Sequence, residues 1–226
     1  MKKIVMGLSG GMDSATLLGI LLDQEYEVHC CNFYYASKHN AYERTAFEKI
    51  ISYYRHRGYP VFEHYFDLSN TFADFKSALL MSGDPIPEGH YEAESMSATV
   101  VPGRNSIFAT IMAGLAESIG AEAVALGVHS GDHHIYPDCR KEFIKSLDTT
   151  IYLGSGGKVQ VIAPLLDDNK TSIIQKGLDL YPSIPYGLTR TCYKDQPLSC
   201  GKCGSCQERL EAFTNLNLTD PISYDE

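Results

Sequence analysis

Gly7-Leu8-Ser9-Gly10-Gly11-Met12-Asp13-Ser14 joins an apolar segment to a segment with helical spacing and is the strongest indication of the fold class. It follows residues 3–8, which have the composition of a buried strand, and it leads into residues 14–23, whose leucines recur at helical spacing. Glycines at such a junction allow a tight turn and a close approach of the backbone to a ligand. The free N–H groups and the positive dipole end of the helix favour a bound anion. The pattern therefore predicts an anion-binding loop between the first strand and the first helix.

Three side chains make this loop more than a glycine turn that starts a helix. The hydroxyls of Ser9 and Ser14 can donate hydrogen bonds to a diphosphate, and a carboxylate such as Asp13 is costly in an anion site unless it serves a metal or a ligand. No Lys-Ser/Thr pair follows the glycines, so the loop is not a Walker A motif, and the G-x-G-x-x-G dinucleotide fingerprint is also absent.

Beyond this loop, strand-like and helix-like segments alternate along the chain. Further strands are expected at residues 27–35, 60–66, 123–128 and 159–162, and helices at residues 41–57, 104–119, 141–152, 170–180 and 205–213. This alternation predicts an α/β fold, a Rossmann-like parallel sheet with helices on both faces. Residues 83–99 carry prolines and few apolar residues, and we expect them to form a long loop or lid. We expect an α/β domain over residues 1–188 and a C-terminal metal-binding segment, residues 189–226, packed on it.

Composition restricts the location and the partners of the protein. The 226 residues carry a formal net charge of −9, and no apolar run approaches the ~20 residues that span a bilayer. The apolar run after Lys3 is too short for a signal peptide, so we expect a cytoplasmic protein with no membrane partner. The acidic balance also argues against a direct nucleic-acid partner.

Four of the seven cysteines are closely spaced near the C-terminus. Cys192, Cys200, Cys203 and Cys206 have the spacing C-x₇-C-x₂-C-x₂-C, which can close a tetrahedral zinc site with no open position. We therefore expect one structural Zn²⁺ per chain. An iron–sulfur cluster is the competing interpretation, because C-x₂-C-x₂-C also occurs in ferredoxin-type sequences.

Two further segments follow a strand or precede a helix near the expected ligand crevice. Val100–Val101-Pro102-Gly103-Arg104-Asn105 places Arg104 and Asn105 at a helix N-terminus, and a long polar loop, residues 127–140, follows the strand at 123–128. Ligands of open parallel sheets bind beyond the carboxyl ends of the strands, so these segments and the glycine loop are expected to face one crevice. His129, His133 and His134 in that loop could suggest a metal, but we expect them to line the site or to be solvated.

The segment Ser9-Gly10-Gly11-Met12-Asp13-Ser14 resembles the pyrophosphate loop of the ATP-pyrophosphatase family. The resemblance implies the adenine nucleotide alpha hydrolase type of fold, with ATP and Mg²⁺ as cofactors and cleavage of ATP between its α- and β-phosphates. It implies nucleotide binding by Leu8, Ser9, Gly10, Gly11, Met12, Asp13 and Ser14, and we add Phe33, Lys38, His39 and Arg104.

The glycine loop, the VPGRN and YPDCR segments and the C-terminal cysteines together resemble the family of 7-cyano-7-deazaguanine synthases. The resemblance extends from residue 4 to about residue 210 and implies 7-carboxy-7-deazaguanine and ammonia as substrates. It also implies two successive activations by ATP, first of the carboxylate and then of the resulting amide, as well as structural Zn²⁺ and a homodimer.

Residue roles follow from the chemistry of these substrates. A carboxylate, Asp132 or Asp138, can accept hydrogen bonds from the guanine-like ring edge, and Arg104 or Arg140 can pair with the substrate carboxylate. We expect catalytic roles for Ser9, Asp13, Ser14, Arg104, Asp132 and Arg140, and substrate binding by Tyr35, Asn105, Asp132, Tyr136, Asp138 and Arg140. The alternatives are a helix cap for either aspartate, a surface ion pair for Arg140 and ordinary packing for Tyr136.

One segment departs from the family pattern. Where the family has F-D-Y-G-Q-R-H, this sequence has Phe33-Tyr34-Tyr35-Ala36-Ser37-Lys38-His39. This difference leaves open an enzyme that stops at the amide, or a ligase that joins the deazaguanine carboxylate to another amine, such as a protein N-terminus. A tRNA-modifying enzyme of the same loop family is a further alternative, but it would need a basic RNA-binding surface, and the net charge of −9 argues against one. A non-enzymatic zinc-stabilised binding module is another, but it leaves the glycine loop unexplained.

Overall fold

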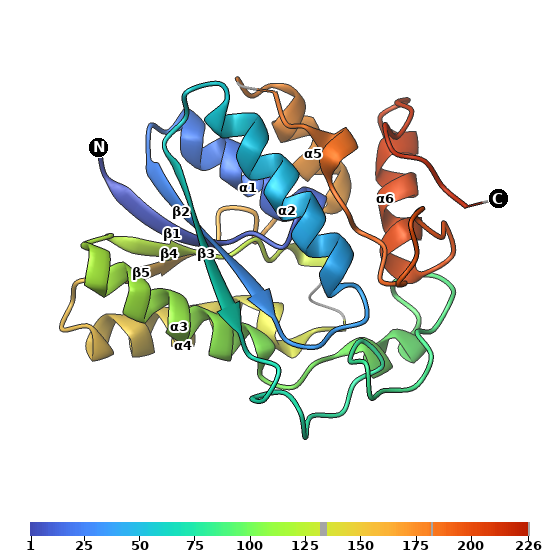
Figure 1. Ribbon diagram of the computed structural model, residues 1–226, viewed down its shortest axis with the longest axis horizontal. Helices are drawn as coiled ribbons and strands as arrows, with labels where there is room; N and C mark the ends of the chain where they lie inside the picture. The colour runs from blue at the N-terminus through green and yellow to red at the C-terminus, as the bar shows by residue number, and fades with distance from the viewer. Residues whose placement is uncertain (132–134, 182, 226) are drawn as a thin grey trace.

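The computed structural model describes residues 1–131, 135–181 and 183–225. A five-stranded sheet, all of whose pairings are parallel, has the order β3-β2-β1-β4-β5 (Figure 1). Its strands are β1 (Lys3–Gly7), β2 (Glu27–Tyr34), β3 (Val61–Asp67), β4 (Ala123–Ala125) and β5 (Gln160–Ile162). The strand order runs outward in both directions from β1, so a crevice opens beyond the carboxyl ends of β1 and β4.

The helices cover both faces of the sheet, as the sequence predicts. The helices are α1 (Met12–Asp23), α2 (Asn40–Arg55), α3 (Arg104–Ile119), α4 (Lys141–Gly154), α5 (Lys170–Leu178) and α6 (Gly204–Asn215). Short 3₁₀ turns lie at Glu94–Thr99, Pro137–Cys139 and Tyr186–Leu188. In Figure 1, α1, α2 and α5 lie on one side of the sheet and α3 and α4 on the other.

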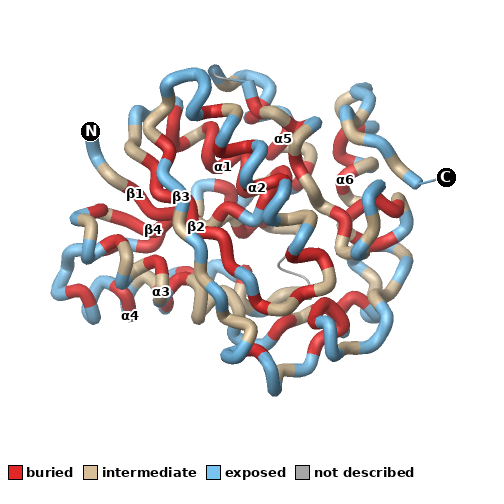
Figure 2. The backbone as a smooth tube through the Cα atoms, viewed as in Figure 1, coloured by how far each residue is buried: buried red, intermediate tan, exposed pale blue. Residues whose placement is uncertain are grey.

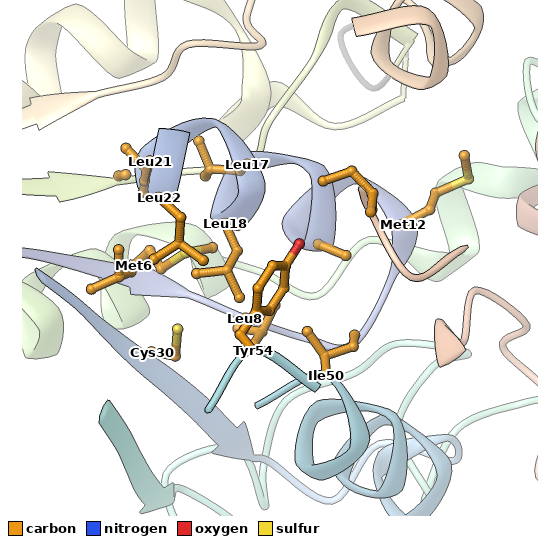
Figure 3. Close-up of a cluster of buried hydrophobic side chains, with 14 of the residues drawn as sticks. Met6, Leu8, Met12, Leu17, Leu18, Leu21, Leu22, Cys30, Ile50 and Tyr54 are labelled. Atoms are coloured by element: carbon orange, nitrogen blue, oxygen red, sulfur yellow. The ribbon is translucent and has the colours of Figure 1, made fainter. Parts of the chain in front are cut away.

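Alternate residues of the central strand supply two separate cores. Ile4 and Met6 of β1 pack with α1, α2 and α5, whereas Val5 between them packs with α3 and α4. Figure 2 shows that the central strand is buried along most of its length. Figure 3 shows the first cluster, in which leucines of α1 meet Met6 and Tyr54. Because both faces are buried, the strand has no polar alternation and appears in the sequence as a continuous apolar run.

The C-terminal segment is joined to this core through α6 and one buried arginine. Ala212 and Phe213 of α6 belong to the first cluster. Arg209 is fully buried and donates to both carboxylate oxygens of Asp220 at 2.7 and 2.9 Å and to the Thr189 hydroxyl at 2.7 Å. These bonds hold the chain in place both before and after the four cysteines. The division into residues 1–188 and 189–226 stays a prediction.

The predicted bounds of α3 agree with the structure, and the other elements differ at one or both ends by one to three residues, because the end residues of an element are the least determined by local sequence. The strand predicted at 123–128 ends at Ala125, and the next three residues, 126–128, line the cavity described below. Among the described residues, no helix is long and apolar enough to cross a membrane.

Candidate active site

The glycine loop has a backbone that only glycine can adopt at one position. Gly10 has a φ of +89°, and a Cβ placed there would lie 2.7 Å from the Glu43 carbonyl oxygen and 2.9 Å from the Ala46 Cβ. Gly11 is the N-cap of α1, so no side chain of the cap residue occupies the first N–H groups of that helix. The Ser14 hydroxyl donates to the Gly11 carbonyl at 3.0 Å, and Ser9 Oγ accepts from the Gly11 N–H at 3.2 Å. The loop is therefore a tight turn beside a helix N-terminus, as an anion site requires.

Gly10→Ala is expected to destabilise the protein by about 2–5 kcal/mol, from about 1–2 kcal/mol of left-handed backbone strain and the close contact with α2. The affinity for ATP should fall by roughly tenfold or more as the loop shifts. Gly58→Ala is the control, because Gly58 also has a positive φ, +81°, but a Cβ there meets nothing within 4 Å. Urea unfolding and ATP titration measure both effects, and equal losses in the two variants would contradict the packing argument.

A cavity of about 240 Å³ opens beyond the carboxyl ends of the strands and brings most of the predicted residues together. Of the residues predicted to bind nucleotide or substrate, those that line it are Leu8, Ser9, Gly11, Asp13, Ser14, Phe33, Tyr35, His39, Arg104, Asn105 and Tyr136. The single crevice that the sequence predicts is therefore present in the structure.

Several predicted residues lie elsewhere. Lys38 donates through Nζ to the carbonyls of Gly83 and Asp84, at 3.0 and 2.6 Å, and does not line the cavity. Asp138 accepts from the Asn105 N–H at 3.2 Å, so its carboxylate caps α3, the alternative role that the sequence left open. Arg140 is exposed at the start of α4. Asp132, His133 and His134 lie outside the described residues.

A buried charged cluster stands at the floor of the cavity, beside the glycine loop. Lys170 Nζ lies 2.7 Å from Asp13 Oδ2, 3.1 Å from Glu208 Oε2 and 3.0 Å from His129 Nε2. The side chains of Lys170 and His129 are 6% and 1% exposed, so the ammonium needs these partners to keep its charge. Burial alone would raise the pKa of Asp13, but the Lys170 ammonium and His129 outweigh it and hold that pKa well below its usual range.

Two members of this cluster, Lys170 and Glu208, could not be predicted as site residues from the sequence. A lysine in the first turn of a predicted helix is a weak signal, because a cation is disfavoured at the positive dipole end. Glu208 carries no local signal, since it approaches Lys170 from a helix 38 positions further along the chain.

Another part of the cavity lining, here called the aromatic wall, combines aromatic rings with the Arg104 guanidinium. Arg104 Nη1 donates to the Tyr35 hydroxyl at 3.4 Å, and burial raises the pKa of Tyr35. Tyr136 forms a 2.7 Å hydrogen bond with the Thr99 hydroxyl, and the Phe33 ring stacks on Phe108 with centroids 4.0 Å apart. This wall combines a flat apolar surface with a cation, which suits a planar anionic ligand.

The four predicted cysteines meet at one point. The Sγ atoms of Cys192, Cys200, Cys203 and Cys206 lie within 4.8 Å of one another, and those of Cys200 and Cys206 are 4.0 Å apart. Tetrahedral Zn–S bonds of ~2.3 Å require S···S separations of roughly 3.8 Å, so the cluster fits a metal ion. Backbone N–H groups point at two of the sulfurs: those of Lys194 and Cys200 at Cys192, and those of Lys202 and Cys203 at Cys200.

The cysteine segment also borders the glycine loop and the long loop before α3. The Arg190 N–H donates to the Gly10 carbonyl at 2.8 Å. The Gly89 N–H donates to the Lys202 carbonyl at 3.2 Å, and Glu88 forms a β-bridge with Cys203. The segment predicted to be a lid is thus attached to the cysteine cluster at this point.

A parallel sheet with a glycine-rich, serine-bearing loop at the first helix defines a nucleotide-binding α/β protein of the pyrophosphate-loop class. A solved 4-thiouridine synthetase in complex with RNA and bound ATP has the same fold, with a TM-score of 0.52 and 22% identity, covering 96% of this chain and 51% of that one.

The sequence comparisons are more specific. The family model described as queuosine biosynthesis protein QueC matches residues 3–217. The 7-cyano-7-deazaguanine synthase of Pseudoalteromonas atlantica is 40% identical over 224 residues and 99% of each chain, and that of Archaeoglobus fulgidus is 42% identical over 99% of this chain and 91% of the relative. The chain belongs to this QueC family of 7-cyano-7-deazaguanine synthases.

Proposed function

We propose that this protein is an ATP-dependent ligase that converts 7-carboxy-7-deazaguanine and ammonia into 7-cyano-7-deazaguanine. The observation that carries the proposal is the joining of the glycine loop, Arg104 and the aromatic wall in one cavity, in a chain that matches the synthases over its full length.

A carboxylate is a poor electrophile, so its oxygen first attacks the α-phosphorus of ATP and releases pyrophosphate. Ammonia then displaces AMP to give the amide. Activation of the amide oxygen by a second ATP and loss of AMP give the nitrile.

The residues of the cavity have separate tasks in this proposal. The N–H groups at the start of α1 and the hydroxyls of Ser9 and Ser14 hold the departing pyrophosphate. Lys170 adds a fixed positive charge beside the loop, and Arg104 pairs with the carboxylate of the substrate while the aromatic wall holds its ring.

Two metals belong to the proposal. Asp13 would hold Mg²⁺, because its Oδ1 is buried and has no hydrogen-bond partner among the described residues; Mg²⁺ supplies charge neutralisation to phosphates. The four cysteines would hold one Zn²⁺, since all four are protein ligands and leave no open position. The homodimer stays a prediction.

The assay is incubation with 7-carboxy-7-deazaguanine, ATP, Mg²⁺ and ammonium, followed by quantification of AMP and product mass. The nitrile mass with AMP supports the proposal, and absence of AMP release would refute it. The amide mass or the mass of another conjugate would instead indicate one of the alternatives left open by residues 33–39. Nothing in the comparisons supports those alternatives.

Arg104→Ala is expected to raise the KM for 7-carboxy-7-deazaguanine by about 10–100-fold, because a hydrogen bond to a charged group contributes ~1.5–3 kcal/mol. The KM for the neutral amide should change by less than about threefold, since the amide carries no charge to pair. Arg44→Ala serves as the control, because the Arg44 side chain is 53% exposed and does not line the cavity. Steady-state kinetics with acid and amide test this, and equal losses for the two substrates would remove the carboxylate-binding role from Arg104.

A further inference from the structure

The Lys170 ammonium is held by two carboxylates from different parts of the molecule. Asp13 comes from the glycine loop at the start of α1, and Glu208 comes from α6. The Glu208 side chain is only 11% exposed and Lys170 only 6%, so this pair is buried rather than a surface ion pair. A buried ion pair restrains the positions of its two charged groups more than a surface pair does, because separating them leaves a charge unpaired where water cannot solvate it.

The two carboxylates differ in their place relative to the phosphate site of the proposed function. Asp13 belongs to the loop that would receive phosphates and Mg²⁺, and a carboxylate that coordinates a metal gives up part of its interaction with an ammonium. Glu208 lies on α6, outside that loop, and has no role toward phosphates or Mg²⁺ in the proposed function. It is therefore the partner that can fix the position of the ammonium throughout the reaction.

The position of Glu208 is determined by the cysteine cluster. Cys203 is the N-cap of α6, and the N–H groups of Cys206 and Gln207 both donate to the Cys203 carbonyl at 3.0 Å. Glu208 follows two residues after Cys206, in the first turn and a half of that helix. Its Oε1 also occupies space that only glycine leaves free, because a Cβ on Gly131 would lie 2.6 Å from it.

We propose that Glu208 is a positioning residue that holds the Lys170 ammonium beside the pyrophosphate loop and so links the cysteine segment to the nucleotide site. The expected effect on turnover rests on the proposed function. The ion pair between Glu208 and Lys170 is a feature of the structure and does not depend on that function. Glu208 lines the same cavity, and the role proposed for it is to act through Lys170 and not on the reacting atoms.

Glu208→Gln tests the proposal because it keeps the shape of the side chain and removes its charge. The turnover number for AMP release should fall by roughly 10–100-fold, the range seen when a supporting residue of a site is removed, while the ATP dissociation constant changes by less than about threefold. Glu211→Gln is the matched control on the same helix, where the side chain is 51% exposed, and it should behave as the wild type. Metal content should stay the same in all three proteins.

A double-mutant cycle separates positioning from a general structural effect. In a Lys170→Met background, Glu208→Gln should lower turnover by no more than about twofold further, since the group through which it acts is already gone. A second readout does not need turnover: acetylation of Lys170 by acetic anhydride, measured by peptide mass spectrometry, should be at least about threefold faster in Glu208→Gln than in Glu211→Gln.

Three outcomes would overturn the inference: wild-type turnover in Glu208→Gln, fully multiplicative losses in the double variant, or equal acetylation of Lys170 in the two glutamine variants. If the wild type releases no AMP with the deazaguanine acid, the proposed function fails. In that case the acetylation rates alone decide whether Glu208 holds Lys170.

Discussion

Asp13→Asn is expected to lower the turnover number for AMP release by about 10²–10³-fold, the loss typical of removing one preorganised electrostatic group from an active site. The substitution keeps the size of the side chain but removes the charge that faces Lys170 and that would hold Mg²⁺. The free energy of unfolding should fall by only about 1–3 kcal/mol, because Lys170 retains Glu208 as a partner. Quenched-flow or steady-state assays of AMP, with urea unfolding alongside, measure both quantities.

Asp23→Asn is the control for this substitution, since Asp23 is exposed at the opposite end of the same helix. It should leave both turnover and stability close to those of the wild type. A folded Asp13→Asn protein that releases AMP at nearly the normal rate would remove the carboxylate from the ATP reaction.

Cys203→Ser should abolish metal binding and lower the free energy of unfolding by at least ~3 kcal/mol, since binding of structural Zn²⁺ contributes up to about 10–16 kcal/mol to the folding of small zinc domains. The effect should spread to the nucleotide site, because Cys203 begins α6 and its neighbour Lys202 anchors the loop at Gly89. Elemental analysis and thermal unfolding, in the presence and absence of a chelator, provide the measurement.

Cys30→Ser is the matched control, a buried cysteine of the sheet core that lies outside the metal cluster. It should lose some stability, since a buried hydroxyl replaces an apolar thiol, but keep one metal per chain. Iron with visible absorbance in the wild type would favour the iron–sulfur alternative. Unchanged thermal stability after metal removal would show that the metal is not structural.

Local sequence patterns were sufficient for the elements of the fold. The apolar run before Gly7, the leucine spacing of α1 and the glycine-terminated α3 each depend on contacts within a few residues, so their elements could be predicted. The short strands were predicted too long, β4 by three residues and β5 by one, because a three-residue strand is defined by pairing with its neighbours and not by its own composition.

Two sites could also be predicted from local patterns, the glycine loop and the four-cysteine cluster, because the members of each are close in the chain. The other charges that face the loop could be found only from the folded structure. Lys170 and Glu208 are 157 and 195 positions from Asp13, and their contact depends on α5 and α6 packing against α1 and the loop beside it. The same packing placed the Asp138 carboxylate at the N-terminus of α3 and left Arg140 exposed. The substrate roles that the sequence suggested for these two residues stay predictions. Residues close in the chain can be brought together by a single turn, so their spacing predicts a site. A buried ion pair between distant segments forms only when the sheet and its helices pack together, so no local pattern predicts it.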